Sequence, residues 1–213
     1  MLAIFSAPEA PGKLAVTDAH DALLQIGNAR WHLQSACYKL YDARRLDGLR
    51  FREDLHHGED GLFVYEALLR SSAFVFSTEP KWDILERPGS ASHTPYSSKW
   101  LTAIDAAEEM LALAPDEEVA DALMLNVIKR AKLVEKQALL SGGSREDVRK
   151  VRAVFRKYSG AFEKRKRPAW QRMGYLLYRE LPPPLLRPIL RLQDAALARQ
   201  TARLKKRGAG RVS

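Results

Sequence analysis

The chain has 213 residues, of which 46% are hydrophobic and 29% are charged, and its formal net charge is +9 at neutral pH. This length and composition are sufficient to bury a sizeable core in one domain or one and a half. A single cysteine, Cys37, excludes an internal disulfide, and no stretch approaches the roughly 18 apolar residues of a transmembrane helix. The apolar run from Met1 ends at Pro8 without the basic region of a secretory signal, so we expect a cytoplasmic chain.

In the first part of the chain, short strands alternate with short helices. Runs of apolar residues predict strands at residues 2–5, 73–76 and 81–86. Apolar spacings of three and four, or a Thr-Asp start, predict helical segments at residues 19–26, 42–46 and 62–71. Residues 31–41 are expected to be extended, with Cys37 as a packed strand residue, and Pro88-Gly89 interrupts the chain.

From Ser97 onward the pattern is helical throughout. Amphipathic stretches, separated by prolines or glycines, predict helices at residues 99–114, 116–140 and 145–166. Further helices are expected on both sides of Pro182-Pro183-Pro184, and residues 208–213 are expected to be a frayed tail. The predicted fold class is α/β, with a few short strands followed by a mainly helical C-terminal region. The predicted domains are residues 1–96 and 97–213.

A pair of carboxylates, Glu59 and Asp60, follows Gly58 and opens the helix predicted at residues 62–71. One interpretation is structural, because unpaired backbone N–H groups and the helix dipole favour carboxylates in a first turn. The other is functional. Adjacent residues at a helix start point in different directions, so one carboxylate can cap the helix while the other takes a proton from a hydroxyl group. General-base help of this kind contributes roughly 10²–10⁴-fold in rate.

The order of motifs around this pair resembles the acceptor-side half of family-2 glycosyltransferases of the GT-A type. The matching motifs are Lys39-Leu40-Tyr41, Arg50-Phe51, Glu59-Asp60 with the helix and strand after it, and R-x-x-S-x-S from Arg87 to Ser92. The resemblance covers residues 36 to 93 well and the flanks loosely. It implies a partial GT-A-like domain over residues 1–96, in which Asp60 is the catalytic base and Glu59 is its structural partner.

The resemblance also implies a set of residues that contact the substrate or its diphosphate: Lys39, Arg87, Ser90, Ser92 and His93. In the complete enzyme a D-x-D motif holds a divalent cation, Mn or Mg, and the sequence contains neither this motif nor the opening nucleotide-binding strand. We therefore expect a truncated or degenerate relative, with no cofactor for this chain alone. The charge of the leaving diphosphate would then depend on basic side chains, of which Arg87 and His93 are the candidates. We interpret His56 and His57 as surface residues.

The implied activity is inverting transfer of a sugar from a nucleotide sugar to a glycan or lipid-linked acceptor, in the synthesis of a cell-surface polysaccharide. Two alternatives stay open. The missing D-x-D favours an inactive remnant that acts as an interaction protein. The basic residues from Arg145 to Lys157 would suit a nucleic-acid-binding protein, but no helix-turn-helix, zinc-finger or RNP pattern supports one.

Positive charge is concentrated at the C-terminal end. Residues 141–213 contain 20 Lys and Arg against 5 Asp and Glu, whereas residues 1–140 contain 15 against 21. Aromatic residues beside these charges, namely Trp170, Tyr175 and Tyr178, predict that the segment 164–206 associates with an anionic membrane surface, as a peripheral contact at the inner membrane. The other interpretation is that the aromatic residues pack on the protein's own helices, and both stay open.

Overall fold

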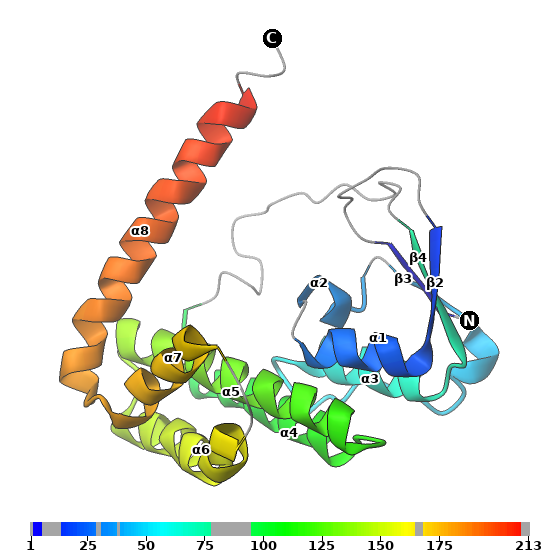
Figure 1. Cartoon of the computed structure of the whole chain (residues 1–213), viewed down its shortest axis with the longest axis horizontal. Helices are drawn as coiled ribbons and strands as arrows, with labels where there is room; N and C mark the ends of the chain where they lie inside the picture. The colour runs from blue at the N-terminus through cyan, green and yellow to red at the C-terminus, as the bar shows by residue number, and fades with distance from the viewer. Residues whose placement is uncertain are drawn as a thin grey trace.

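The structure of the protein is a computed structural model that describes residues 2–5, 14–28, 31–37, 39–77, 95–164 and 168–209. At one end a small sheet stands over two helices, and further helices form the layers below them (Figure 1). The predicted combination of a few short strands and a mainly helical C-terminal region is confirmed.

Among the described residues, four short strands form one mixed sheet. They are β1 (Leu2–Phe5), β2 (Leu14–Asp18), β3 (Lys39–Tyr41) and β4 (Ala73–Ser77), in the order β2-β4-β1-β3. The central strands β1 and β4 are parallel, with Ala3 opposite Val75, and each outer strand is antiparallel to its neighbour. The strands predicted at residues 2–5 and 73–76 are confirmed, and the strand predicted at 81–86 lies outside the described residues.

Helices α1 (Ala19–Gly27) and α3 (Glu59–Leu69) lie side by side below the sheet (Figure 1). Asp18 caps α1, because its side chain accepts a hydrogen bond from the Asp21 amide at 2.8 Å. The predicted start of α1 is confirmed, and the helical turn predicted at residues 42–46 is present as the shorter η1 (Ala43–Arg45). α3 begins three residues before its predicted start, and therefore includes both carboxylates.

The extended segment predicted at residues 31–41 is only partly correct. Its first residues form a helical turn, α2 (Trp31–Gln34), and among its described residues only β3 is extended. The Gln34 side chain is buried and donates a hydrogen bond to the Ile26 carbonyl at 2.9 Å, which turns the chain back against the end of α1. Cys37 is exposed in the bend between α2 and β3, so its prediction as a packed strand residue is wrong.

In the second part of the chain, the described residues form the short turn η3 (Ser98–Leu101) and five helices. These are α4 (Thr102–Ala112), α5 (Glu117–Leu140), α6 (Arg145–Lys164), α7 (Ala169–Glu180) and α8 (Pro183–Ala209). The predicted helices are confirmed with shifts of a few residues at their ends. The frayed tail was predicted from Gly208, but α8 continues to Ala209, and residues 210–213 lie outside the described part.

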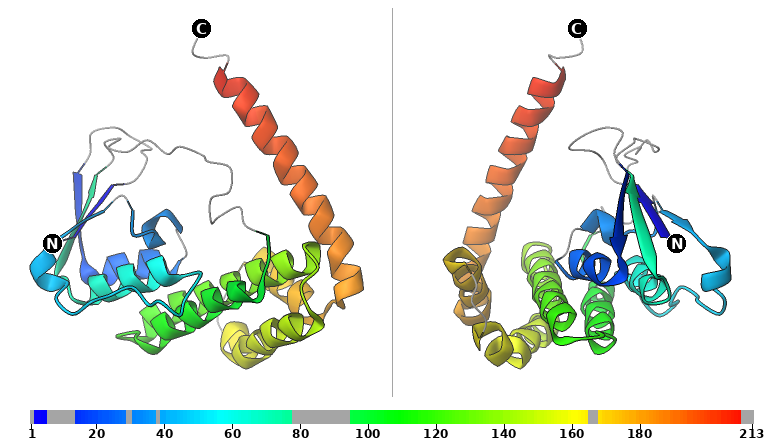
Figure 2. Two further views of the ribbon diagram at one scale, coloured as in Figure 1. Left: turned by 180° about the vertical axis from the view of Figure 1, so that it is seen from behind. Right: turned by 45° about the vertical axis from the view of Figure 1, so that its right-hand side comes forward.

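One hydrophobic core extends from the helices below the sheet into the helices of the second part. Leu68, Ile104, Val127 and Phe155 are all buried in it, and they come from α3, α4, α5 and α6 in turn. The core therefore crosses residue 96, and the division of the chain into two domains there stays a prediction. α8 packs only its first turns on α5, and the rest of the helix extends away from the body (Figure 2).

Candidate functional site

The helix that carries the two carboxylates begins at a glycine that no other residue can replace without strain. Gly58 has a φ of +92°, in the left-handed region, and it precedes Glu59 at the start of α3. A Cβ atom at this position would lie 2.8 Å from the Cβ of Ala106 in α4. The chain therefore passes so close to α4 that only glycine fits both the conformation and the space.

Replacing Gly58 by Ala is expected to lower the free energy of unfolding by about 2 kcal/mol, because the left-handed conformation and the contact with Ala106 are both unfavourable. Gly48→Ala is the matched control, since Gly48 also has a positive φ, of +72°, but has nothing within 4 Å of an added Cβ. Urea denaturation compares the two variants. An equal effect in both would show that the contact with α4 contributes nothing.

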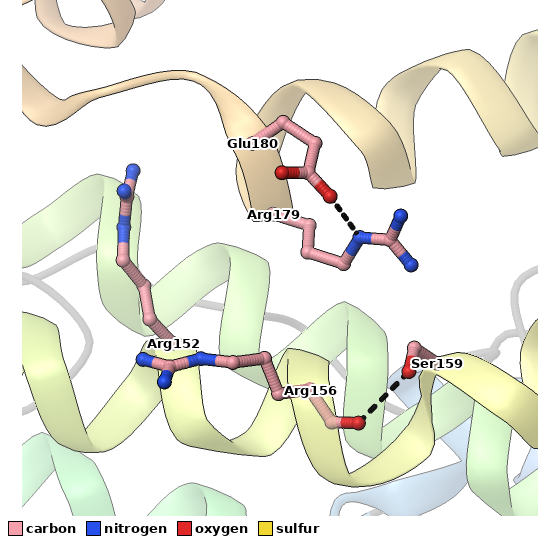
Figure 3. Close-up of a pocket in the computed structure, with 5 residues that line it drawn as sticks. All are labelled: Arg152, Arg156, Ser159, Arg179 and Glu180. Atoms are coloured by element: carbon pink, nitrogen blue, oxygen red, sulfur yellow. Dashed lines mark hydrogen bonds and ion pairs between the residues drawn. The ribbon is translucent and has the colours of Figure 1, made fainter.

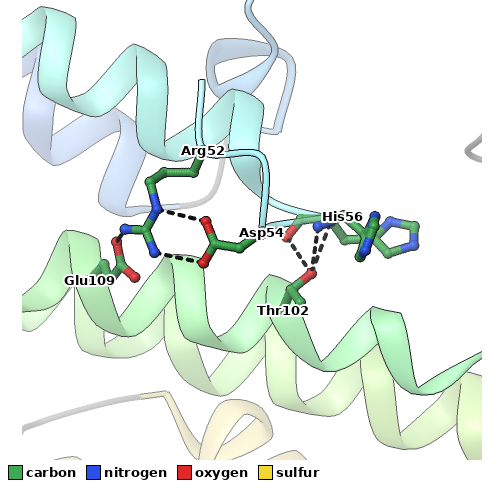
Figure 4. Close-up of polar contacts among 6 residues, drawn as sticks. Arg52, Asp54, His56, Thr102 and Glu109 are labelled. Atoms are coloured by element: carbon green, nitrogen blue, oxygen red, sulfur yellow. Dashed lines mark hydrogen bonds and ion pairs between the residues drawn. The ribbon is translucent and has the colours of Figure 1, made fainter. Parts of the chain in front are cut away.

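Polar contacts fasten the loop before α3 to the second part of the chain (Figure 4). Arg52 binds Asp54 through two nitrogens, at 2.8 and 2.7 Å, and reaches Glu109 of α4 at 2.8 Å. The Thr102 hydroxyl, at the start of α4, accepts hydrogen bonds from the backbone amides of His56 and His57 at 3.1 and 2.9 Å. These contacts fix the loop and with it the position of Glu59 and Asp60.

Asp60 is half-buried in the first turn of α3, close to β3 and to the bend that precedes this strand. The Ser35 hydroxyl lies 3.5 Å from Asp60 Oδ2 and donates a long hydrogen bond to it. Lys39 of β3 is only 7% exposed, and its ammonium group donates to the carbonyls of Ser35 and Cys37. Burial lowers the pKa of Lys39 to about 8, and the negative charge of Asp60 acts in the opposite direction.

Tyr41 completes this group of side chains. Its hydroxyl donates to the Ala36 carbonyl at 3.1 Å, and its ring packs edge-on against Phe63 with the centroids 5.8 Å apart. Burial raises the pKa of Tyr41, and the charge of Asp60 raises it further, so the phenol stays protonated at neutral pH. Phe51 stacks on the other side of Phe63 at 4.1 Å, which links the Arg50-Phe51 motif to the same place.

The lowered pKa of Lys39 predicts a pH-dependent stability. Between pH 8 and 10.5 the unfolded chain binds more protons at this position than the folded one, so the folded state gains stability as the pH rises through this range. Lys39→Met removes the titrating group. We expect the stability of the natural protein relative to this variant to increase by about 2 kcal/mol from pH 7 to pH 10.5 in urea denaturation. A difference that stays constant or falls with pH would contradict the burial of a charged ammonium.

The structure thus brings together two of the predicted site residues, Lys39 and Asp60. Sequence reasoning did not place Ser35 and Tyr41 beside them. A signal for Tyr41 was present, because residues two apart in a strand lie on the same face and Tyr41 follows Lys39 at that spacing. Ser35 lies in a bend and carries no such signal. The remaining predicted residues lie outside the described part of the chain: Arg87, Ser90, Ser92 and His93.

Glu59 takes a different environment from Asp60. Its Oε2 atom is buried, and no described residue forms a hydrogen bond with it. The N-cap residue of α3 is Gly58, which has no side chain to cap the helix. No side-chain capping by Glu59 or Asp60 is observed in the described part of the chain. The exposed side chain of His56 agrees with its interpretation as a surface residue, whereas His57 is half-buried and stacks on Trp100 at 4.4 Å.

A second candidate site is a pocket of about 400 Å³ between α6 and α7, which is lined by charged side chains (Figure 3). Its lining residues are Arg152, Arg156, Ser159, Arg179 and Glu180. Two of the arginines already have carboxylate partners, because Arg152 binds Glu135 at 2.7 Å and Arg179 binds Glu163 and Glu180. The third, Arg156, forms no ion pair with a described residue, and the carboxylates equal the guanidinium groups in number, so the pocket has no net positive charge with which to attract an anion.

No group of three or more His, Cys, Asp and Glu side chains gathers as a metal site among the described residues. We also compared the chain with models of protein families, with curated proteins and with solved structures, and none of them matches it.

Proposed function

We propose that the chain is the acceptor-side half of a family-2 glycosyltransferase of the GT-A type, and that Asp60 is its catalytic base. The observation that supports this most is the position of Asp60. It lies in the first turn of α3 beside Lys39, so two motifs of the resemblance that are 20 positions apart in the sequence meet at one place. Gly58 at the start of α3, and the contacts of the preceding loop with α4, hold Asp60 in this position.

In this proposal Asp60 takes the proton from an acceptor hydroxyl as the hydroxyl oxygen attacks the anomeric carbon of a nucleotide sugar. The bond from that carbon to the diphosphate breaks, and the configuration inverts. Tyr41 keeps its proton at neutral pH and cannot act as a base, which leaves the Asp60 carboxylate as the acceptor of the proton. Arg87 and His93, together with a Mn or Mg ion in the complete enzyme, would neutralise the leaving diphosphate.

The acceptor in this proposal is a glycan or a lipid-linked glycan. The direct test is sugar transfer by the full-length or complemented enzyme, measured as nucleoside diphosphate released in the presence of acceptor. Asp60→Asn should abolish most of this release and leave the fold intact. Unchanged release would contradict the proposal.

An alternative is an interaction protein without turnover, and one observation favours it. Several large apolar side chains on α7 and α8 are exposed, among them Trp170 and Met173. Exposed apolar patches of this kind mark interaction surfaces. If the complemented enzyme transferred no sugar to a glycan or lipid-linked acceptor while the chain still bound a partner protein through α7, that result would favour the interaction protein over the glycosyltransferase.

A further inference from the structure

Helix α7 has one buried and one exposed apolar face. On the buried face Tyr175 is 1% exposed and its hydroxyl donates to the Phe155 carbonyl of α6 at 2.5 Å. On the other face Trp170, Met173 and Leu176 are 69%, 62% and 42% exposed. Tyr175 therefore packs on the protein's own helices, whereas Trp170 lies at the surface, and the membrane interpretation of this segment stays a prediction.

The exposed apolar surface continues around the end of α7. A hollow of about 240 Å³ is lined by Met173, Leu176, Leu177, Glu180 and Leu181, and its accessible surface is apolar. On α8 the first turns bury Leu186 and Leu190 against α5, but Leu185 and Leu192 are exposed. The described side chains of residues 195–200 are all exposed, and this end of α8 points away from the body (Figures 1 and 2).

The charges of α7 and α8 are not balanced by carboxylates among the described residues. Residues 168–209 contain only two carboxylates, and both are paired, Glu180 with Arg179 and Asp194 with Lys136. Four arginines in the same range are exposed and form no ion pair with a described residue: Arg172, Arg187, Arg191 and Arg199. The sequence of α8 adds four more basic residues after position 200. This part of the molecule therefore presents unpaired positive charge beside exposed apolar side chains.

We propose that α7 and the exposed part of α8 bind the surface of a bilayer that contains anionic phospholipid. Trp170, Met173 and Leu176 enter the boundary between headgroups and acyl chains, and the unpaired arginines contact the lipid phosphates. None of the helices in the described part is both long and apolar enough to cross a membrane, so this is a contact in the plane of the interface. A duplex would satisfy the arginines but would leave the apolar face in water. The inference does not depend on sugar transfer.

The test is co-sedimentation of the whole chain with vesicles of phosphatidylcholine alone or mixed with phosphatidylserine. Binding should rise with phosphatidylserine and fall with salt, because surface charges are screened over about 8–10 Å at physiological ionic strength. The variant Arg187→Gln/Arg191→Gln/Arg199→Gln should bind roughly a hundredfold more weakly, at about fivefold for each basic residue.

The matched control for charge is Arg44→Gln/Arg45→Gln/Arg50→Gln, which removes three exposed arginines of η1 and of the segment between η1 and α3. This variant should bind like the natural chain. Equal losses in the two triple variants would overturn the proposal, because they would show attraction by net charge alone. Binding to duplex DNA together with indifference to both kinds of vesicle would overturn it in favour of a nucleic-acid partner.

The apolar contribution is tested by Met173→Glu/Leu176→Glu, which should also lose binding to the vesicles. Both side chains are exposed, so the helix content by circular dichroism should not change. The matched control, Leu69→Glu/Leu113→Glu, places the same charges at exposed leucines on α3 and just after α4 and should keep binding. Trp170→Phe should remove the vesicle-induced blue shift of tryptophan emission. A shift that persists in this variant, or binding that survives Met173→Glu/Leu176→Glu, would contradict docking through α7.

Discussion

Replacement of Asp60 by Asn is expected to lower turnover in the full-length or complemented enzyme by about a hundredfold or more, as for the loss of a general base. The amide keeps the size of the carboxylate and can still accept the long hydrogen bond from Ser35, but it cannot take a proton. The hydrogen bond of 3.5 Å is long and contributes little, so the melting temperature should fall only slightly, through loss of the Asp60 charge near the buried Lys39. Initial rates of diphosphate release and thermal unfolding by circular dichroism measure the two effects.

Two further variants make this result specific. Asp47→Asn makes the same chemical change at an exposed residue and should leave turnover unchanged. Glu59→Gln alters the neighbouring carboxylate, whose buried Oε2 has no hydrogen-bond partner among the described residues, and most of the turnover should survive. If Glu59→Gln rather than Asp60→Asn removed the activity, the two roles would be exchanged. Full turnover in Asp60→Asn, or loss of its fold, would refute the assignment of Asp60 as the base.

The helices of this protein were predictable because their signals are local. Asp116 caps α5 by accepting a hydrogen bond from the Val119 amide at 2.9 Å, and the apolar spacing that follows it gives the helix its length. The strand β2 gave no such signal. It is an edge strand with Val16 exposed, and its pairing partner β4 lies about 60 residues further along the chain. The residues of one strand do not indicate which distant segment it will pair with, so β2 could not be predicted from its own sequence.

Contacts with distant parts of the chain also explain why α2 and part of the candidate site were not predicted. Gln34, at the end of α2, also accepts a hydrogen bond from Arg130 of α5, so the turn depends on a residue almost a hundred positions away. The carboxylate pair of the site was visible as a motif, and its approach to Lys39 was implied by the resemblance. Ser35 reaches Asp60 only because α2 turns the chain back, and no pattern in the sequence predicts that bend.

Removal of Arg152 is expected to have the largest effect on stability. Arg152 of α6 donates to Glu135 of α5 at 2.7 Å and to the Leu181 carbonyl after α7 at 2.6 Å, so it joins three helices. Glu135 is 0% exposed, and its second carboxylate oxygen has no hydrogen-bond partner among the described residues. Arg152→Ala leaves this carboxylate buried and uncompensated, and the free energy of unfolding should fall by about 3–5 kcal/mol in urea denaturation.

The matched control is Arg156→Ala, one turn further along α6, where the side chain is exposed and forms no ion pair with a described residue. Its effect should stay within about 0.5 kcal/mol.

The destabilisation by Arg152→Ala should also depend on pH. Burial raises the pKa of Glu135 and Arg152 opposes this, so without Arg152 the folded state holds a proton on Glu135 more tightly than the unfolded chain does. The difference from the natural protein should therefore shrink as the pH falls toward the ordinary range of a glutamate, and the double variant Glu135→Met/Arg152→Met should recover most of the loss. A loss that is independent of pH and remains in the double variant would show that the hydrogen bond from Arg152 to the Leu181 carbonyl, and not the ion pair with Glu135, holds the three helices together.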